Sequence, residues 1–438
     1  MSLINVGKNI SDNILHQLES HVDAFPVLSE IRRQTFATFQ QCGLPGNKHE
    51  EYRFTPLTKA VEKFDFSPLK NETRNSPGDV MDFLIPNADT HSLVFIDGTY
   101  QPALSSAREV PGLTIGLLDE VVRKSPGVIE PYLSSFSEAS HDPFTAWNIL
   151  GWQSGLFISL DKNITLDKPL AIYHLVDAKS APAVILTRNL IVVGKNSNLR
   201  IIHKINSRGN LPHFVNTVTE AIVHENAGLD YYSVQDDAGE HYEFNRTHIA
   251  QSNSSRVNTF TISLNGKIVR NNLQLSLNGE GCESHMYGLY LLQGDTLVDN
   301  HSVADHQKPN SFSNELYKGI IDDRARGVFN GKIYVRPNAQ KTNAFQSNRN
   351  ILLSDSARIN TKPQLEIWAD DVKCSHGCTS GQLDEEALFY LQTRGISKSN
   401  AQAMLLYAFA GEVINTITIP AVREYLEKVI RTRLHQTQ

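Results

Sequence analysis

A segment of five residues in this 438-residue chain contains two thiols and an imidazole, at Cys374, His376 and Cys378. The two thiols are half of the chain's four cysteines. In an extended strand, side chains two residues apart face the same way, so these three would form one row. Thiolate and imidazole bind zinc, copper or the iron of an iron–sulfur cluster, whereas calcium and magnesium prefer oxygen. The spacing therefore indicates chemistry with a soft metal or with sulfur.

A structural interpretation competes with this one. Three ligands from one short strand are too few for a closed metal site, and Gly377 could bend the row before Cys378. Free cysteine is also often simply buried, so the row could consist of small residues that close a strand. The set matches neither a C-x-x-C redox pair nor a paired C-x-x-C zinc site. Spacing alone leaves both interpretations open.

A second group of imidazoles, at His285, His301 and His306, lies near Asp299 and Asp305. These residues could hold a metal, but their spacing fits no established ligand pattern. We therefore expect structural hydrogen bonds within a β coil instead.

Composition describes the setting of these residues. With 40% hydrophobic and 20% charged residues the chain resembles an ordinary soluble protein, and its net charge of -6 gives no reason to expect nucleic acid as a partner. The stretch from Met1 to Lys8 lacks the apolar run of a secretory signal, and no segment is apolar enough to cross a membrane. Four cysteines do not indicate a disulfide framework. We expect a cytoplasmic protein with free thiols.

Residues 151–378 contain many short apolar strands separated by polar turns, as in Ile191–Leu199 and Ile351–Ile359. The units recur irregularly, which favours a solenoid of β coils over a propeller with fixed blades. We predict a right-handed parallel β-helix, ahead of a β-sandwich. The open ends of such a coil expose unpaired strand edges, which need caps or partners.

The flanking regions follow other patterns. Residues 1–80 show helical spacing of apolar side chains, and 81–150 form a mixed linking region with a hairpin expected at Asp97-Gly98. Residues 379–438 predict a helical domain, with Asp384 as an N-cap and Pro420 opening the last helix. Its apolar stripes suit core packing, or alternatively docking of a partner protein. They comprise Ala403, Leu406, Ala410, Val413, Ile414 and Ile417, and then Val422, Leu426, Val429 and Ile430.

Common catalytic motifs are missing. No Gly-Lys pair is followed by Ser or Thr, so the chain has no Walker A loop and we expect it to bind no ATP. G-x-G-x-x-G, H-E-x-x-H and G-x-S-x-G are absent as well. Any ATP chemistry would therefore belong to another subunit.

The run Cys374-Ser375-His376-Gly377, with the residues that follow it, closely resembles the C-terminal signature of the SufB/SufD family of iron–sulfur cluster assembly proteins, in its SufD-like form. SufB-type sequences carry Glu-His-Glu-Ala at this place. The resemblance spans essentially the whole chain. It also includes Leu44-Pro45 with Lys48, Glu50, Arg53 and Thr55; Asp305-His306 through Pro309, Ser313 and Tyr317-Lys318-Gly319; and Phe329 to Ile333 through Ala339-Gln340.

This resemblance implies a β-helix between helical regions and a scaffold without catalytic activity of its own. The scaffold would work with a SufB-like paralogue and with a SufC-like ATPase bound through the C-terminal helices. A homodimer is the alternative assembly of the isolated chain. His376 matches a histidine that faces the SufB-like subunit, where iron or a nascent cluster is thought to lie, and Cys374 matches the neighbouring thiol. The family commonly has alanine at Cys378, so a metal role there is doubtful. Complexes of the family have been associated with reduced flavin, but no motif places a flavin site in this chain.

Two other functions remain open. One is a SufB-like subunit that itself accepts sulfur, against which the SufD-like form of the signature argues. The other is a β-helix enzyme acting on polysaccharide, which would need carboxylates paired on one exterior face of the coil. The strands show no such repeated set of acidic residues.

Overall fold

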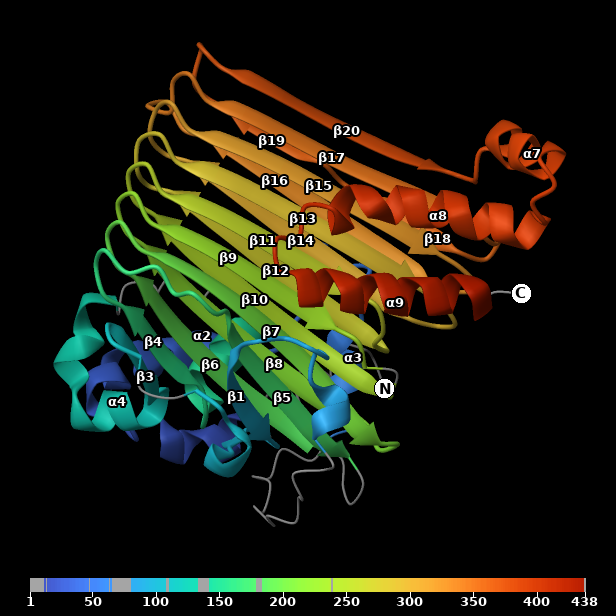
Figure 1. Ribbon diagram of the computed structural model, residues 1–438. Coiled ribbons are helices and arrows are strands. Elements are labelled where there is room, and N and C mark those ends of the chain that lie inside the picture. The colour runs from blue at the N-terminus through green and yellow to red at the C-terminus, as the bar shows by residue number, and fades with distance from the viewer. Residues whose placement is uncertain are drawn as a thin grey trace.

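A computed structural model shows two long sheets that wind together into a β-solenoid of about 8 turns (Figure 1). The structure describes residues 12, 14–46, 48–62, 64, 80–107, 110–132, 142–178, 183–237 and 239–436. The solenoid confirms the predicted parallel β-helix, with helices before it and after it in the sequence. The stretch from Met1 to Lys8, examined above for a secretory signal, lies outside these residues. Within them, no helix is long and apolar enough to span a membrane.

Successive strands of the coil alternate between two sheets. Sheet A has the order β2-β1-β5-β7-β9-β11-β13-β15-β17-β20, and sheet B the order β18-β16-β14-β12-β10-β8-β6-β4-β3, with β19 also paired to β16. Sheet A comprises β1 (His91–Ile96), β2 (Thr99–Tyr100), β5 (Leu170–Ala178), β7 (Asn198–Gly209), β9 (Gly228–Gln235), β11 (Arg256–Ser263), β13 (Glu283–Leu292), β15 (Phe312–Ile321), β17 (Asn343–Leu352) and β20 (Lys373–Gly381). Sheet B comprises β3 (Leu113–Leu117), β4 (Leu156–Leu160), β6 (Ala183–Val193), β8 (His213–Val223), β10 (His241–Gln251), β12 (Ile268–Leu277), β14 (Leu297–His306), β16 (Arg326–Val335), β18 (Arg358–Thr361) and β19 (Gln364–Ile367).

Asparagine-rich turns join the strands of neighbouring coils. Asn163, Asn196 and Asn226 all have positive φ, a conformation that asparagine tolerates better than most residues. Their side chains form a ladder, because Asn226 donates to Asn196 at 3.0 Å and Asn196 donates to Asn163 at 2.8 Å. These polar turns therefore align the coils, while aliphatic and aromatic side chains fill the space between the two sheets.

Helices cover the outer faces of both sheets. Apolar side chains of α8 (Lys398–Ile414) and α9 (Pro420–Gln436) pack against sheet A (Figure 1). The N-terminal region covers sheet B, where Phe144 and Trp147 stack on Phe244 and Phe214. The helices of this region are α2 (Ser29–Cys42), α3 (Leu57–Val61), α4 (Leu118–Lys124) and α6 (Pro143–Gly151).

The predicted helix starts of the C-terminal region are confirmed. Asp384 caps α7 (Glu385–Thr393) by accepting from the backbone of Glu386 and Ala387, and Pro420 opens α9. The apolar stripes of α8 and α9 belong to the core that covers sheet A, so core packing accounts for them.

The two ends of the solenoid differ. At the N-terminal end, β1 and β2 form the hairpin predicted at Asp97-Gly98, and β3 pairs antiparallel with β4. At the C-terminal end, β20 is the last strand of sheet A and α7 projects away from the sheets (Figure 1). No residue of β20 is buried. The coil is thus closed at one end and open at the other.

Candidate functional site

Cys374, His376 and Cys378 lie on one face of β20. In the parallel register with β17, they are the partners of Ala344, Gln346 and Asn348, which are all buried inside the solenoid. The extended row predicted from the spacing is therefore confirmed, and Gly377 does not interrupt the strand. The row continues an interior column of side chains at the point where the coil ends.

The three side chains have different surroundings. Cys374 is partly buried against the interior core, and burial raises the pKa of its thiol. His376 is exposed. The Cys378 sulfur lies 2.9 Å from Oγ1 of Thr361 on β18 in the opposite sheet and 3.8 Å from the side-chain oxygen Oδ1 of Asn348. Cys378 thus has hydrogen-bond partners within the chain that account for its position.

The row does not form a closed metal site within this chain. Among the described residues, one group of three ligand side chains has its ligand atoms within 4.8 Å of one another, and it lies elsewhere, at His213, Asp237 and His241. The row therefore offers soft ligands from one side only. On its other edge β20 has no strand partner in the described sheet, and such an edge can pair with another chain.

Two residues that sequence reasoning missed lie beneath His376. Glu315 on β15 is the register partner of Gln346, which is in turn the partner of His376. Gln346 donates its amide to Glu315 at 2.7 Å. Its carbonyl oxygen is buried, with no hydrogen-bond partner among the described residues. Gln346 follows Glu315 by 31 residues, and His376 follows Gln346 by 30. If the number of residues in each turn of the solenoid had been known, the sequence would have identified this column.

Burial raises the pKa of Glu315 to about 7. Since the folded pKa exceeds the usual value of 4.5, this group stabilises the fold fully below about pH 4.5 and loses that contribution as the pH rises through 7. We expect Glu315→Gln to remove a pH dependence on the order of 3 kcal/mol between pH 4.5 and 8. Urea unfolding across this range would measure it, with exposed Glu225→Gln as the control. A variant whose pH profile equals that of the wild type would contradict the assignment.

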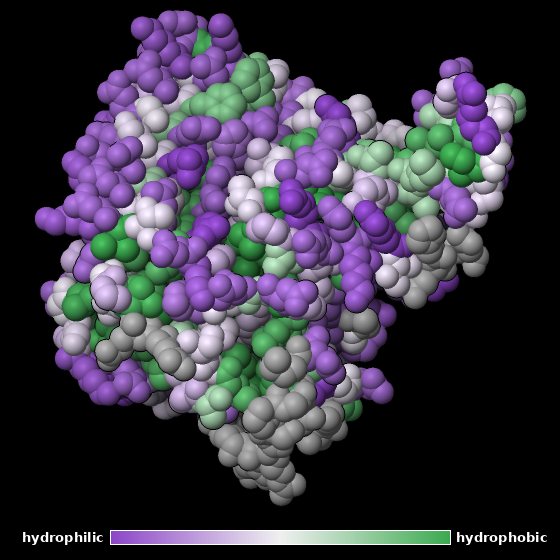
Figure 2. Space-filling model, in the orientation of Figure 1, coloured by the Kyte–Doolittle hydropathy of each residue, from purple (hydrophilic) through white to green (hydrophobic). Residues whose placement is uncertain are grey.

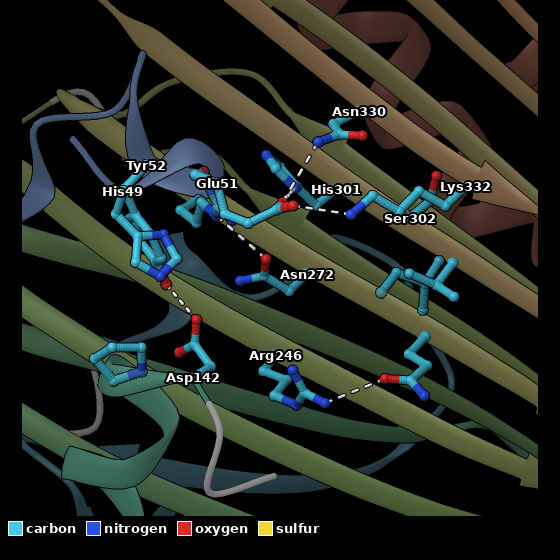
Figure 3. Close-up of a pocket in the computed structure, with 15 residues that line it drawn as sticks. His49, Glu51, Tyr52, Asp142, Arg246, Asn272, His301, Ser302, Asn330 and Lys332 are labelled. Atoms are coloured by element: carbon cyan, nitrogen blue, oxygen red, sulfur yellow. Dashed lines mark hydrogen bonds and ion pairs between the residues drawn. The ribbon is translucent and has the colours of Figure 1, made fainter. Parts of the chain in front are cut away.

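A polar pocket of about 260 Å³ lies on the outer face of sheet B, under the segment of residues 49–52 (Figure 3). Glu51 projects into it and is 2.8 Å from the Lys332 ammonium and 3.1 Å from Nδ1 of His301, while Asn330 donates to it at 3.4 Å. The hydrogen bond from His301, aided by Lys332, holds the pKa of Glu51 well below its usual range. These contacts join the N-terminal segment to β14 and β16.

The carboxylates of this pocket are not paired with each other. Asp142 accepts from the Tyr52 hydroxyl at 2.5 Å and from the Thr145 backbone at 2.9 Å. Asp299, which is not part of the pocket lining, lies 2.6 Å from Arg270, which is. Each of these acidic groups is thus held by a hydrogen-bond donor or a cation of the chain.

The three histidines considered for a second metal site do not meet. His285 is on sheet A beside Glu283, and His301 and His306 are on sheet B. His301 contacts Glu51 and Asp299, and His306 lies 2.8 Å from the Ser313 hydroxyl. The structural hydrogen bonds expected for them are confirmed.

Comparison with known proteins agrees with this geometry. Residues 174–409 match the family model for the SufBD core domain of SUF system FeS cluster assembly, and residues 14–172 match that for the SufBD N-terminal region. An iron–sulfur cluster assembly SufBD family protein of Synechocystis is 32% identical over 399 residues, 89% of this chain and 87% of the relative. The iron–sulfur cluster assembly protein SufD of Escherichia coli is 30% identical over 396 residues, 90% of each chain. A SufBD family protein of Mycobacterium leprae is 28% identical over 403 residues, 90% of this chain and 92% of the relative. The chain therefore belongs to the SufBD family of iron–sulfur cluster assembly proteins.

Proposed function

We propose that this chain is a non-catalytic scaffold subunit of a SUF complex, on which iron–sulfur clusters are assembled at an interface with a SufB-like paralogue. The observation that carries the proposal is the row of Cys374 and His376 on β20, whose outer edge has no strand partner in the described sheet, at the open end of the solenoid. An edge strand with soft ligands suits a partner that pairs with the edge and supplies further ligands.

Iron or a nascent cluster is the cargo of this interface. His376 is exposed and can bind iron through a neutral imidazole nitrogen. The Cys374 thiol must lose its proton to bind, and burial opposes that loss in the isolated chain. A metal ion or a positive charge from the partner would overcome this cost. Cys374 would therefore become a ligand only in the assembled complex, and Cys378, held by Thr361, is the weaker third candidate.

Exposed apolar side chains at the open end suit a partner surface. Ile367 and Trp368, at the end of β19, are 40% and 47% exposed, and Phe345 on β17 is 38% exposed. Ile367 and Trp368 are neighbours in the chain, and large apolar side chains that remain exposed side by side commonly mark a protein interface. Both sheets would therefore take part in the contact with the SufB-like subunit.

The projecting helix α7 suits a different partner, a SufC-like ATPase. Its Phe389 and Tyr390 are 68% and 57% exposed, and Met404 of α8 is 50% exposed. Apolar surface gathers where α7 projects beside the end of α8 (Figure 2). The apolar faces of α8 and α9 are already buried against sheet A, so α7 and the adjoining end of α8 are the surface left for docking. ATP-driven movement could then act on the open end of the coil, because α7 directly follows β20 in the chain.

We expect the chain to co-purify, without oxygen, with a SufB-like and a SufC-like protein expressed together with it. Phe389→Asp combined with Tyr390→Asp should remove the ATPase and keep the SufB-like subunit, because a charge on an apolar docking surface opposes its burial. Affinity purification followed by iron and sulfide analysis measures both effects. Val128→Asp, at an exposed apolar position in the N-terminal region, is the matched control. A chain that elutes alone as a monomer or homodimer in the presence of both partners would refute the proposal.

The remaining alternative is a SufB-like subunit that accepts sulfur itself. The SufD-like form of the signature and the similarity to a protein named SufD favour the scaffold role. Persulfide on Cys374 or Cys378, formed by this chain alone with a sulfur donor and found by mass spectrometry, would instead support the alternative.

A further inference from the structure

A second cluster of metal-binding side chains lies far from the row on β20. His213 begins β8, His241 begins β10 and Asp237 lies in the turn that precedes β10. All three are at most 4% exposed. Five strand spacings separate β9, which precedes Asp237, from β20 along sheet A, or about 24 Å at 4.7–4.9 Å per spacing. The cluster is therefore independent of the site proposed above.

Three potential ligand atoms converge in this cluster. Nε2 of His213 is 3.0 Å from Oδ2 of Asp237 and 2.8 Å from Nδ1 of His241. The same Nδ1 is 3.7 Å from the Asp237 oxygen. Within the part of the chain that the structure describes, this is the one group of three potential ligand side chains whose ligand atoms all lie within 4.8 Å of one another.

The outer contacts determine which atoms carry protons. Nδ1 of His213 faces the backbone oxygen of Leu211 at 3.3 Å, and Nε2 of His241 faces a carboxylate oxygen of Glu243 at 2.8 Å. Both oxygens are acceptors, so each ring in its neutral form donates its N–H outward and turns a lone pair inward. This is the arrangement in which metal-binding histidines are usually held, with the second nitrogen donating to a carboxylate or a backbone carbonyl.

The carboxylate is oriented in the same way. Oδ1 of Asp237 accepts from the Ser207 hydroxyl at 2.8 Å and from the Gly239 backbone at 3.0 Å. Oδ2 is left to face the two inward nitrogens. Two lone pairs and a negative oxygen at these distances repel one another unless a proton or a metal ion lies among them.

We propose that His213, Asp237 and His241 bind one divalent first-row transition-metal ion, such as Zn(II) or Fe(II). Imidazole and carboxylate suit both ions, and three protein ligands leave a position for water. Nitrogens 2.0–2.1 Å from a tetrahedral ion stand about 3.3 Å apart, so the rings need to separate by about half an ångström on binding. The ion would join the turn before β10 to the first residues of β8 and β10, as a structural link between adjacent coils.

Zinc binding tests the proposal directly in the full-length chain. The potential ligands on β20 are first removed by combining Cys374→Ser, His376→Ala and Cys378→Ser, so that this row binds no metal. After treatment with a chelator, the protein is dialysed against Zn(II), and against Fe(II) without oxygen in a parallel arm. We expect one equivalent of metal to bind, and the two arms show which ion binds more tightly. Co(II) as a substitute should give the visible absorption of a coordinated ion.

The ligands are then changed one at a time. His213→Gln, His241→Gln and Asp237→Asn should each weaken zinc binding at least about tenfold, and Glu243→Gln should weaken it about 10–100-fold by releasing the ring of His241. His248→Gln is the matched control, because His248 is buried on β10 but bonds Ser276. It should leave zinc affinity unchanged.

Two results would overturn the proposal. One is that the protein without the β20 ligands binds neither ion and shows no cobalt absorption, in which case the cluster holds only a shared proton. The other is zinc affinity that stays the same in every ligand variant that folds, as judged by circular dichroism. The first measurement needs no ligand variant, so a failure to bind metal overturns the proposal even if those variants do not fold.

Discussion

Replacing His376 with alanine is expected to lower the iron–sulfur cluster assembled on the complete complex at least about tenfold, while folding and partner binding remain intact. Loss of a residue that merely orients a metal ligand costs about 10–100-fold, so loss of the ligand itself should cost no less. His376 is exposed on an edge strand and its side chain holds no core together, so the fold should tolerate alanine. Iron and acid-labile sulfide per complex, after anaerobic reconstitution, measure the effect.

Ser375 provides the matched control for this substitution. It is also exposed on β20 but faces the side of the strand opposite to His376. Ser375→Ala should therefore keep the wild-type cluster yield, and Cys374→Ser should lower the yield. An undiminished yield with His376→Ala would remove this residue from the mechanism. A yield that falls only because the partners no longer bind would make His376 an interface residue and not a ligand.

The row of ligands was predictable from the sequence because a strand repeats every two residues. Cys374 and His376 share a face in any extended segment, wherever the segment lies in the fold. The starts and apolar faces of the C-terminal helices were also predictable, because they depend only on residues that are near one another in the sequence. Asp384 and Pro420, for example, act on the residues that directly follow them. Local patterns therefore carried these predictions.

The environment of the row was not predictable because it depends on the length of each turn. Corresponding residues in successive coils, Arg256, Glu283, Phe312, Asn343 and Lys373, are 27 to 31 residues apart. A shift of one residue would turn a side chain from the interior to the exterior, so the column of Glu315 and Gln346 beneath His376 required the observed register. The partners of Glu51 are also distant, since Lys332 follows it by 281 residues.

Replacing Asp299 with alanine is expected to lower the free energy of unfolding by about 3–5 kcal/mol, because it leaves the guanidinium of Arg270 buried without its counter-charge. The two side chains are 2% exposed or less, and their nearest atoms are 2.6 Å apart. Asp299 also accepts from the Thr55 hydroxyl, and Arg270 donates to the Glu51 backbone. The pair thus holds the N-terminal segment against sheet B. Urea unfolding at pH 7 would measure the loss.

Further substitutions separate the effect of charge from the loss of contacts. Asp295→Ala removes an exposed partner of Arg324 and should leave the unfolding midpoint unchanged. Replacing Asp299 and Arg270 together by leucine should cost less than Asp299→Ala alone, because no unpaired charge then remains buried. A double variant less stable than Asp299→Ala would show that the contacts, and not the charge, dominate.

The pH dependence gives an independent check on the same pair. Burial opposes ionisation of Asp299, but the charges of Arg270 and His301 outweigh it and lower the pKa of Asp299 to about 2. Because this pKa lies below its ordinary value of 3.8, the stabilisation is complete above about pH 4 and is lost as the pH falls toward 2. The difference in unfolding free energy between wild type and Asp299→Asn should therefore be constant from pH 5 to 7 and shrink below pH 4. If the difference stayed the same at pH 3, ionised Asp299 would not be the source of the stability, and the N-terminal segment would be held mainly by Glu51 with Lys332 and His301.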